Sequence, residues 1–442
     1  MSPLPHLVHI ETFGCQMNES DSELIRALLK GEGFSFTPDR ERADVLLVNT
    51  CAIRENAHNK IYAHLAELKE LKKQRPLVIG VLGCMAQNLK NDLAEQEPLI
   101  DVLAGPDSYR RLPSLLLNAL AAQEEGLFQR GFALDLSEYE TYEGILPDRD
   151  NGVNAWITVM RGCDNFCTFC VVPYTRGRER SRPPESVLAE ARDAAARGFT
   201  QITLLGQNVN SYRHGEWDFA RLIGAVADTP GIHRVRFTSP HPKDFPVTLL
   251  HVIASHPKIC KHIHLPLQSG SDRILELMGR TYSADDYLAL VDQIRHTIPG
   301  VTLTTDIICG FCSESDADFQ ATQRVVEQVQ FDSAYIFKYS ERKHTIAARK
   351  YPDDVPDRIK GTRVATLVEL QRQISLSRNR RYIGKHVEIL VERDATKSPT
   401  QGMGRTDGNV TVIWEKGSMP FEPGTLTTKY IFDASAATLY GR

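Results

Sequence analysis

Three thiols stand in one short loop of this sequence, Arg161-Gly162-Cys163-Asp164-Asn165-Phe166-Cys167-Thr168-Phe169-Cys170. Soft ligands this close together converge readily on a single metal centre. They are one fewer than the four thiolates that close an ordinary zinc or iron-sulfur site. A cluster bound here would therefore keep one iron without a protein ligand, and a substrate can bind at that open position.

Two structural alternatives fit this loop less well. A structural zinc site needs a fourth Cys or His nearby, but the next candidates are His214 and Cys260. A disulfide framework is disfavoured because three thiols cannot pair off and the chain shows no secretory features. The loop is therefore predicted to bind an iron-sulfur cluster.

The CxxxCxxC spacing, directly after a predicted strand, resembles the signature of the radical S-adenosylmethionine (SAM) enzymes. In that family the open iron binds SAM, and one electron from the cluster cleaves its sulfonium to give a 5'-deoxyadenosyl radical. The resemblance implies that Cys163, Cys167 and Cys170 hold the catalytic 4Fe-4S cluster. Phe166 and Phe169 suit this role, because aromatic rings between the ligands shield a cluster from water.

Length and composition describe a folded globular protein. The chain has 442 residues, enough for two or three domains, with 42% hydrophobic and 24% charged residues. Its net charge of -4 is not the footprint of a general nucleic-acid binder, so any RNA contact must come from a local patch. The first residues lack the pattern of a signal peptide and no stretch is long enough to span a membrane. We therefore expect a cytoplasmic protein without a membrane partner, in which nine cysteines favour metal or redox chemistry.

The first hundred residues repeat an apolar run that ends at a cysteine. The runs are residues 7–14 before Cys15, 44–50 before Cys51 and 78–83 before Cys84. Each reads as a buried parallel strand, and in an open α/β sheet the carboxyl ends of the strands border the ligand site. Any one of these cysteines alone reads as a small buried hydrophobe. Three at equivalent positions predict ligands of a second cluster, again with an open corner.

Further along, the pattern changes twice. Residues 127–150 are polar and read as a link after an N-terminal parallel α/β domain over 1–126. Strand and helix then alternate through residues 151–382, which predicts a partial (β/α)6 barrel with its chemistry at the carboxyl ends of the strands. The six expected strands are 153–160, 200–206, 232–238, 261–266, 301–309 and 331–339. A long basic helix over 354–382 leads to residues 383–442, where short apolar runs punctuated by Gly predict a small β-barrel.

Polar groups near the same end of the predicted barrel are candidates to hold the ribose, adenine or carboxylate of SAM. Ordinary loop hydrogen bonding is an equally good reading of any one of them. The candidates are Gln207, Asn208, Asn210, His264, Gln268, Thr305 and Asp306. The densest positive run follows the cluster loop, and its side chains are either solvated or in contact with RNA phosphates. It consists of Arg176, Arg178, Arg180 and Arg182.

The remaining cysteines are assigned to the core. Cys309-Gly310-Phe311-Cys312 has the spacing of a thioredoxin motif, but it stands late in a barrel pattern without thioredoxin topology around it. Cys260 has no suggestive neighbours.

Over nearly its full length the chain resembles the radical-SAM methylthiotransferases. The resemblance rests on five runs: residues 12–18, 49–54, 83–87, 160–182 and 264–271. It implies an auxiliary 4Fe-4S cluster on Cys15, Cys51 and Cys84 beside the radical-SAM cluster, and a C-terminal barrel of the TRAM type. The implied reaction adds a methylthio group to carbon 2 of N6-(dimethylallyl)adenosine beside the anticodon of tRNA and uses two SAM. The expected partners of this monomeric enzyme are tRNA, an electron donor protein and a sulfur or iron-sulfur carrier.

The chain departs from that family at two places, and the first departure is expected to alter a turn. This chain has Gly310-Phe311-Cys312-Ser313-Glu314 where the family usually has Gly-Phe-Pro-Gly-Glu, and Arg342-Lys343-His344-Thr345 where it usually has Arg-Pro-Gly-Thr. Two other functions stay open. One is the same chemistry on a threonylcarbamoyl-adenosine in tRNA or an aspartate of a ribosomal protein. The other is an RNA-binding protein with a structural metal.

Overall fold

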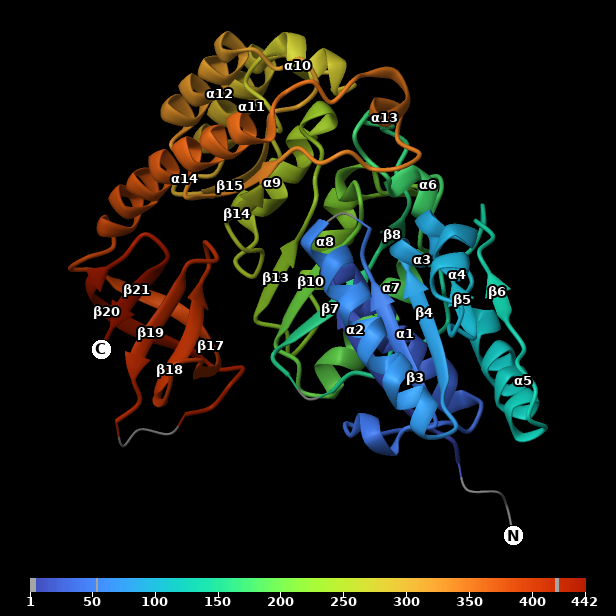
Figure 1. The fold of residues 1–442 in the computed structure, drawn as a ribbon. Helices are drawn as coiled ribbons and strands as arrows, with labels where there is room; N and C mark the ends of the chain where they lie inside the picture. The colour runs from blue at the N-terminus through green and yellow to red at the C-terminus, as the bar shows by residue number, and fades with distance from the viewer. Residues whose placement is uncertain (1–4, 53–54, 151, 418–420) are drawn as a thin grey trace.

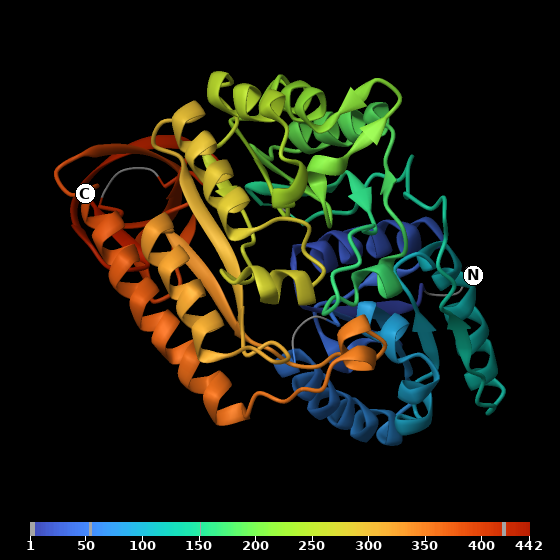
Figure 2. The ribbon, with the colours of Figure 1, turned by 90° about the horizontal axis from the view of Figure 1, so that it is seen from above.

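The computed structural model describes residues 5–52, 55–150, 152–417 and 421–442. Three bodies follow one another along the chain, as Figure 1 shows: an N-terminal parallel sheet with helices, a central part of alternating strands and helices, and a small C-terminal barrel. Seen from above, the central part lies between the other two (Figure 2). The predicted fold class is confirmed.

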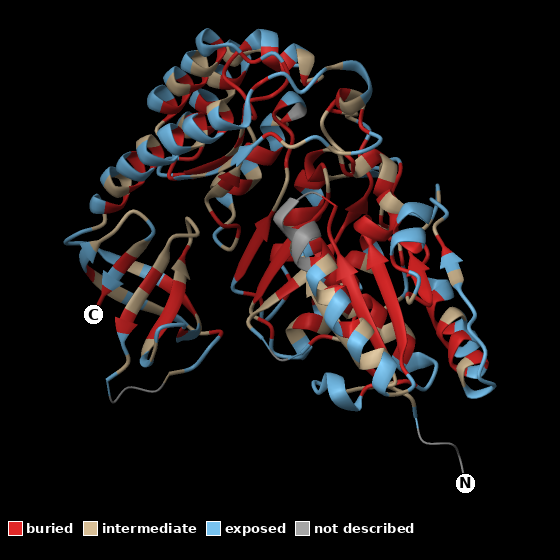
Figure 3. Cartoon of the chain, viewed as in Figure 1, coloured by how far each residue is buried: buried red, intermediate tan, exposed pale blue. Residues whose placement is uncertain are grey.

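The N-terminal body is a six-stranded sheet in the order β2-β1-β3-β4-β5-β6, in which every neighbouring pair is parallel. All residues of β3 and β4 are buried, as Figure 3 shows, because helices cover both faces of the sheet. The predicted strands before the three cysteines are confirmed. The strands are β1 Leu7–Phe13, β2 Ser35–Phe36, β3 Val45–Thr50, β4 Val78–Gly83, β5 Val102–Ala104 and β6 Gly131–Ala133.

The helices of this body divide between the two faces. Side chains of α1 and α5 pack in one core with Val8, Val45 and Val78, while side chains of α2, α3 and α4 pack in the other with Leu46 and Val81. This alternation is expected for strands buried on both sides. The helices are α1 Gln16–Gly31, α2 Glu55–Gln74, α3 Cys84–Leu89, α4 Asn91–Gln96 and α5 Leu112–Glu124.

Residues 127–150 do more than link two domains. β6 adds an edge strand to the N-terminal sheet, so that sheet extends beyond residue 126. The buried Tyr142 packs in the core beside α1 and α5, and its hydroxyl accepts from Tyr109 N at 2.9 Å and donates to Pro106 O at 2.9 Å. The segment is therefore part of the N-terminal body and not a separate link between two domains.

The central body contains the six predicted strands, arranged as two three-stranded parallel sheets in the orders β13-β10-β7 and β14-β15-β16. A parallel bridge between Val235 and Ile259 lies where the first sheet leads toward the second. The result is an open barrel. The strands are β7 Asn154–Thr158, β10 Gln201–Leu205, β13 Arg234–Phe237, β14 His262–His264, β15 Thr302–Cys309 and β16 Ser333–Lys338.

Apolar side chains of these strands, among them Ile157, Leu204 and Ile307, pack outward against helices in the largest core of the molecule. The covering helices are α7 Pro184–Ala196, α8 Phe219–Ala227, α9 Val247–Ser255, α11 Ala284–Thr297, α12 Asp316–Val329 and α14 Asp357–Arg380. Short elements occupy the carboxyl ends of the strands and the loops beyond them: the strand pair β8 Met160–Arg161 and β9 Arg180–Ser181, and helices α6 Val172–Arg176, α10 Asp272–Leu277 and α13 Ile346–Lys350.

The C-terminal body is a closed barrel in the order β17-β18-β19-β21-β20. It is docked at the amino ends of central strands: Arg236 Nη2 donates to Thr406 O at 2.8 Å, and Asp407 Oδ1 accepts from Lys261 N at 3.0 Å. The barrel therefore lies at the end opposite the cluster loop. Its strands are β17 His386–Ala395, β18 Ser398–Thr406, β19 Thr411–Glu415, β20 Leu426–Ala434 and β21 Thr438–Gly441.

Both turns that depart from the family pattern use a left-handed residue. Ser313 has φ of 62° and His344 has φ of 71°, and each stands where the family usually has glycine. Asp354 supports the first turn, since its carboxylate accepts from Ser313 N at 2.6 Å and from Ser313 Oγ at 3.1 Å. A non-glycine residue therefore takes up the conformation that glycine adopts more cheaply. Among the described helices, none combines the length and apolar character needed to cross a bilayer.

Candidate active site at the domain junction

The three N-terminal cysteines meet at the carboxyl edge of their sheet. Cys15 is the N-cap of α1 and Cys84 is the first residue of α3, whereas Cys51 directly follows β3. Gly14 has φ of +141°, and a Cβ there would lie 2.5 Å from the Cβ of Cys51, so only glycine lets these loops approach.

Hydrogen bonds, burial and a nearby charge shift the pKa values of two of these thiols. A hydrogen bond with Cys51 is the main cause that lowers the pKa of Cys15 to about 6, against the effect of burial. Burial raises the pKa of Cys84, with Arg176 acting in the opposite direction. Helix amino termini stabilise thiolates, the form in which cysteine binds metal. The structure thus brings Cys15, Cys51 and Cys84 into one neighbourhood suited to ligands.

The second group of thiols lies in the loop after β8. Gly162 has φ of +80°, and a Cβ there would lie 1.9 Å from Arg178 O, so the start of this loop requires glycine. Each sulfur accepts at least one N–H donor, which is what an anionic ligand needs. These are Asn165 Nδ2 to Cys163 Sγ at 3.5 Å, Arg280 Nη1 to Cys167 Sγ at 3.3 Å and Val172 N to Cys170 Sγ at 3.5 Å.

Main-chain hydrogen bonds fix the same loop in place. Thr168 N donates to Met278 O at 2.8 Å, and Thr168 O accepts from Ala347 N at 2.7 Å. Phe166 has φ of 47°, the kind of strained conformation that clusters at functional sites. The rings of Phe166 and Phe169 are half-buried on either side of Cys167, consistent with the expected shielding.

Arg280 was not anticipated from the sequence. Besides its bond to Cys167, its Nε donates to Tyr282 OH at 2.9 Å and its Nη2 to Pro266 O at 3.2 Å. Burial would lower the pKa of Arg280, but Tyr282 and Cys167 together raise it, so the guanidinium stays charged beside the thiol. The only local sequence signal for the position of Arg280 is the preceding Gly279, which follows α10 with a φ of 70° and turns the chain toward the cluster loop.

The two cysteine groups lie next to each other across the domain junction. α3, which begins at Cys84, packs on α6, which begins two residues after Cys170. Val171 packs directly against Cys84 and Ala52. Within the described residues no three His, Cys, Asp or Glu side chains are arranged to hold a single metal ion. That is compatible with clusters, whose thiolates bind different irons and so stand farther apart than the ligands of one ion. Ile53 and Arg54 of the run after Cys51 lie outside the described residues.

Most of the arginine run is not a surface patch. Arg176, Arg180 and Arg182 are buried, and each forms an ion pair. The partners are Asp21 for Arg176 at 2.7 Å, Asp107 for Arg180 at 2.8 Å and Glu190 for Arg182. A buried charge must be paired, so these three side chains are committed inside the protein and do not contact phosphates as predicted. Of the four, Arg178 alone is exposed.

Three of the predicted SAM residues carry buried polar atoms without a hydrogen-bond partner. Gln207 accepts from Gly162 N at 2.6 Å through Oε1, yet its Nε2 has no partner. Asn208 donates to Glu179 Oε1 at 3.0 Å, while its Oδ1 has none, and neither has Oε1 of Gln268. Buried polar groups are normally satisfied, so these atoms fit a polar ligand at the carboxyl ends of the strands.

The other candidates divide into two kinds. Asn210 brackets the main chain of His241 at 2.7 and 2.9 Å, and Thr305, fully buried, accepts from Leu267 N and donates to Leu265 O. Both side chains use their hydrogen bonds to brace loops of the protein, so they do not hold SAM as predicted. His264 and Asp306 are half-buried and pair at 3.2 Å between Nε2 and Oδ2.

The remaining thiols behave as core residues. Cys260, Cys309 and Cys312 are each buried, with 2% exposure or less. Burial raises the pKa of Cys309 to about 12 and that of Cys260 to about 11, which leaves both protonated and unreactive.

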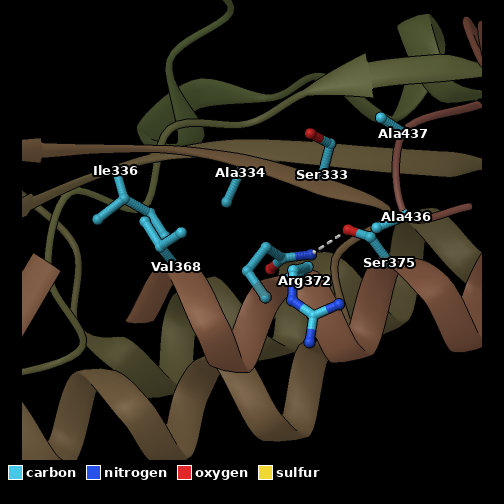
Figure 4. Close-up of a pocket in the computed structure, with 9 residues that line it drawn as sticks. Ser333, Ala334, Ile336, Val368, Arg372, Ser375, Ala436 and Ala437 are labelled. Carbon is cyan, nitrogen blue, oxygen red and sulfur yellow. Dashed lines mark hydrogen bonds between the residues drawn. The ribbon is translucent and has the colours of Figure 1, made fainter. Parts of the chain in front are cut away.

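A small cavity lies away from all of these residues. It has a volume of about 190 Å³ and lies between β16, α14 and the turn before β21, where Ser333, Ala334, Val368 and Ala436 line it (Figure 4). Sites for drug-sized ligands usually exceed about 300 Å³, so this cavity does not compete with the cysteine-rich junction as a cofactor site.

Family models match each body of the chain in turn. Residues 7–105 match the Uncharacterized protein family UPF0004, residues 157–326 the Radical SAM superfamily and residues 380–426 the TRAM domain. Among solved structures, the fold resembles the radical S-adenosylmethionine methyltransferase TsrM from Kitasatospora setae with a TM-score of 0.60 at 14% identity. That likeness covers 78% of this chain and 74% of the other, and it concerns the fold alone.

Close relatives match almost end to end. A tRNA-2-methylthio-N(6)-dimethylallyladenosine synthase from Chlorobium luteolum is 47% identical over 98% of this chain and 96% of its own length. The enzyme of the same name from Porphyromonas gingivalis strain W83 is 46% identical over 98% of this chain and 94% of its own. At this identity and coverage, the chain belongs to the family of the tRNA-2-methylthio-N(6)-dimethylallyladenosine synthases.

Proposed function

We propose that this protein is a radical-SAM methylthiotransferase that adds a methylthio group to carbon 2 of N6-(dimethylallyl)adenosine beside the anticodon of tRNA. The observation that carries the proposal is the junction where two groups of three thiols adjoin, joined by Arg176 and Val171. A protein with one structural metal needs only one such group. When bound, the two 4Fe-4S clusters and two SAM supply the radical chemistry and the transferable sulfur.

The residues of the chain have distinct tasks in this proposal. Cys163, Cys167 and Cys170 hold the SAM-binding cluster, and the N–H donors on their sulfurs stabilise the thiolates. Cys15, Cys51 and Cys84 hold the auxiliary cluster. The unpartnered amide atoms of Gln207, Asn208 and Gln268 orient SAM through hydrogen bonds. α3 packed on α6 fixes the separation between the two cysteine groups.

Several parts of the proposal concern partners. tRNA is the substrate, supported by the name of the relatives and by the TRAM match. We further propose that the enzyme works in the cytoplasm as a monomer, with an electron donor protein and a sulfur or iron-sulfur carrier. The relatives support the dimethylallyl target over threonylcarbamoyl-adenosine or a ribosomal aspartate.

The test uses a strain that lacks the gene and carries it back on a plasmid. Mass spectrometry of tRNA nucleosides should show the 2-methylthio derivative with the wild-type gene and its unmethylthiolated precursor with Cys163→Ala. Cys260→Ala, a buried thiol away from the junction, is the matched control and should restore the modification. Normal modification with Cys163→Ala would refute the proposal, and a mass change on a ribosomal protein instead would assign the other target.

A further inference from the structure

We propose that Tyr335 and Phe337 form the stacking site for the target adenine of tRNA. This inference rests on the proposed function and adds the residues that hold the substrate base. Chemistry on carbon 2 of a base requires that the base leave its stack, and enzymes hold an extruded base between flat side chains.

The register of β16 places both rings on one face of the sheet. Tyr335 pairs with Asp306 of β15 and Phe337 pairs with Ile308. Ile336, between them, packs against the core beneath α14. Since successive side chains point to opposite faces of a strand, Tyr335 and Phe337 point to the inner side of the open barrel.

Both rings are exposed although they lie within a strand of the open barrel. Tyr335 is 56% exposed and Phe337 is 40% exposed, whereas every residue of β10 and β13 is buried. Exposed apolar groups that adjoin polar ones commonly mark a binding site. Here the adjoining polar groups are His264, whose ring centroid lies 6.0 Å from that of Tyr335, and Asp306.

The spacing suits a planar ring. Side chains two residues apart on a strand are about 7 Å apart, which is about twice the contact distance between carbon atoms. A base can therefore lie between or across the two rings. Stacking accepts any base, so discrimination must come from hydrogen bonds, and the carboxylate of Asp306 with its partner His264 can supply these at the edge of the base.

Charge near this strand fits tRNA. Lys338 directly follows Phe337, Lys343 lies in the next loop and Arg349 in α13. All three are exposed, and the pairs of Lys338 with Asp357 and of Lys343 with Asp92 are surface pairs that exchange readily for phosphate. Because Arg176, Arg180 and Arg182 are buried, Lys338 on the outer face of β16 and Lys343 and Arg349 in the segment after the strand supply the exposed positive charge in this part of the chain.

The first experiment measures stacking without catalysis. Reconstituted holoenzyme is titrated with a tRNA anticodon stem-loop that carries 2-aminopurine at the target position, whose fluorescence is quenched by stacking. We expect the base bound to the wild type to stay quenched, and to fluoresce more strongly with Tyr335→Ala or Phe337→Ala, where the extruded base lacks a ring to stack on, together with about 5- to 150-fold weaker binding. Tyr335→Phe and Phe337→Tyr keep the rings and should bind as the wild type does. Tyr139→Ala, which removes an 85% exposed ring on the N-terminal body, is the matched control.

The second experiment distinguishes whether the two rings stack on the target adenine of tRNA or on the adenine of SAM. SAM cleavage by the holoenzyme without tRNA should stay within twofold of the wild type in both alanine variants, while methylthiolation of tRNA falls. Parallel loss of SAM cleavage would assign the rings to the adenine of SAM and overturn the inference, as would unchanged quenching. If the wild type stacks the base but leaves the nucleoside unmodified, the proposed function fails while the stacking site stands.

Discussion

The Nε atom of Arg176 lies 3.2 Å from the Sγ atom of Cys84, so a side chain from the central body hydrogen-bonds a proposed cluster ligand in the N-terminal body. Its Nη2 donates to Asp21 Oδ2 at 2.7 Å, and the other oxygen of Asp21 accepts from Arg161 at 2.7 Å. All of these groups are buried. Burial would lower the pKa of Arg176, but Asp21 and Cys84 raise it well above its usual value, so the cation is retained beside Cys84.

Loss of this cation should destabilise the junction. Arg176→Met leaves the fully buried Asp21 without one of its two arginine partners, so we expect a loss of about 3–5 kcal/mol in the free energy of unfolding. Urea denaturation of the unreconstituted protein measures it. Arg178→Met removes an exposed arginine from the same run and should change stability by less than about 1 kcal/mol. Equal effects from the two variants would contradict the assigned role.

Iron content should report the two cysteine groups separately. The wild type should bind about eight irons per chain after anaerobic reconstitution, and either Cys163→Ala or Cys15→Ala should bind about four. Cys260→Ala should keep the wild-type content, since this thiol is buried in the core. Iron and sulfide analysis with absorption spectroscopy provides the measurement. Four irons in the wild type would remove the auxiliary cluster from the proposal.

SAM affinity should depend on the side-chain amide of Gln268, which has an atom without a hydrogen-bond partner, and not on Thr305, which braces a loop. Gln268→Leu removes a buried oxygen that has no protein partner, so it should weaken SAM binding by about 10- to 150-fold, the range for a hydrogen bond to a charged ligand. Thr305→Val instead breaks hydrogen bonds within the protein and should lower stability with little change in SAM affinity. Calorimetric titration of the reconstituted enzyme distinguishes them. The assignment fails if the two variants exchange these phenotypes.

Stability should fall in mild acid through His241. Burial lowers the pKa of His241 to about 3, with Arg280 and Lys243 acting in the same direction, and its Nδ1 accepts from Lys243 N at 3.1 Å. The folded pKa is below the unfolded value near 6.5, so stability present above pH 6.5 is lost as the pH falls toward 3. Between about pH 7.5 and about pH 5 we expect a loss of about 2 kcal/mol from this group. Denaturation across this range should show that loss in the wild type relative to His241→Asn, and parallel pH profiles would disprove it.

The two left-handed turn residues should respond differently to glycine. His344 is exposed at φ of 71°, a conformation that costs a non-glycine residue about 1–2 kcal/mol, so His344→Gly should raise the melting temperature by a few degrees. Ser313→Gly relieves the same strain but loses the hydroxyl bond to Asp354, so the gain should be smaller. Thermal melting of the two variants gives the comparison. A lower melting temperature for His344→Gly would show that its side chain supports the turn.

Local sequence patterns were sufficient to predict the strands that lead to the two groups of cysteines. Short apolar runs in the sequence predicted the buried strands before Cys15, Cys51 and Cys84 and the strand before the cluster loop. Burial on both faces of a strand requires such runs. Close spacing along the chain predicted one ligand group, Cys163, Cys167 and Cys170, because a single loop must place its thiols near one another to bind a cluster. The other group, Cys15, Cys51 and Cys84, was predicted from equivalent positions after three strands.

The sequence by itself therefore determined the three bodies, the order of their strands along the chain and the two groups of thiols. Only the tertiary structure decided that Arg176, Arg180 and Arg182 are buried in ion pairs, that Asn210 and Thr305 brace loops, that Arg280 reaches Cys167, and that residues 131–133 join the N-terminal sheet. The reason is physical. Backbone periodicity is set by near neighbours, whereas the solvation and pairing of a polar side chain depend on which residues the fold brings beside it, and these can lie far along the chain, as Asp21 does from Arg176.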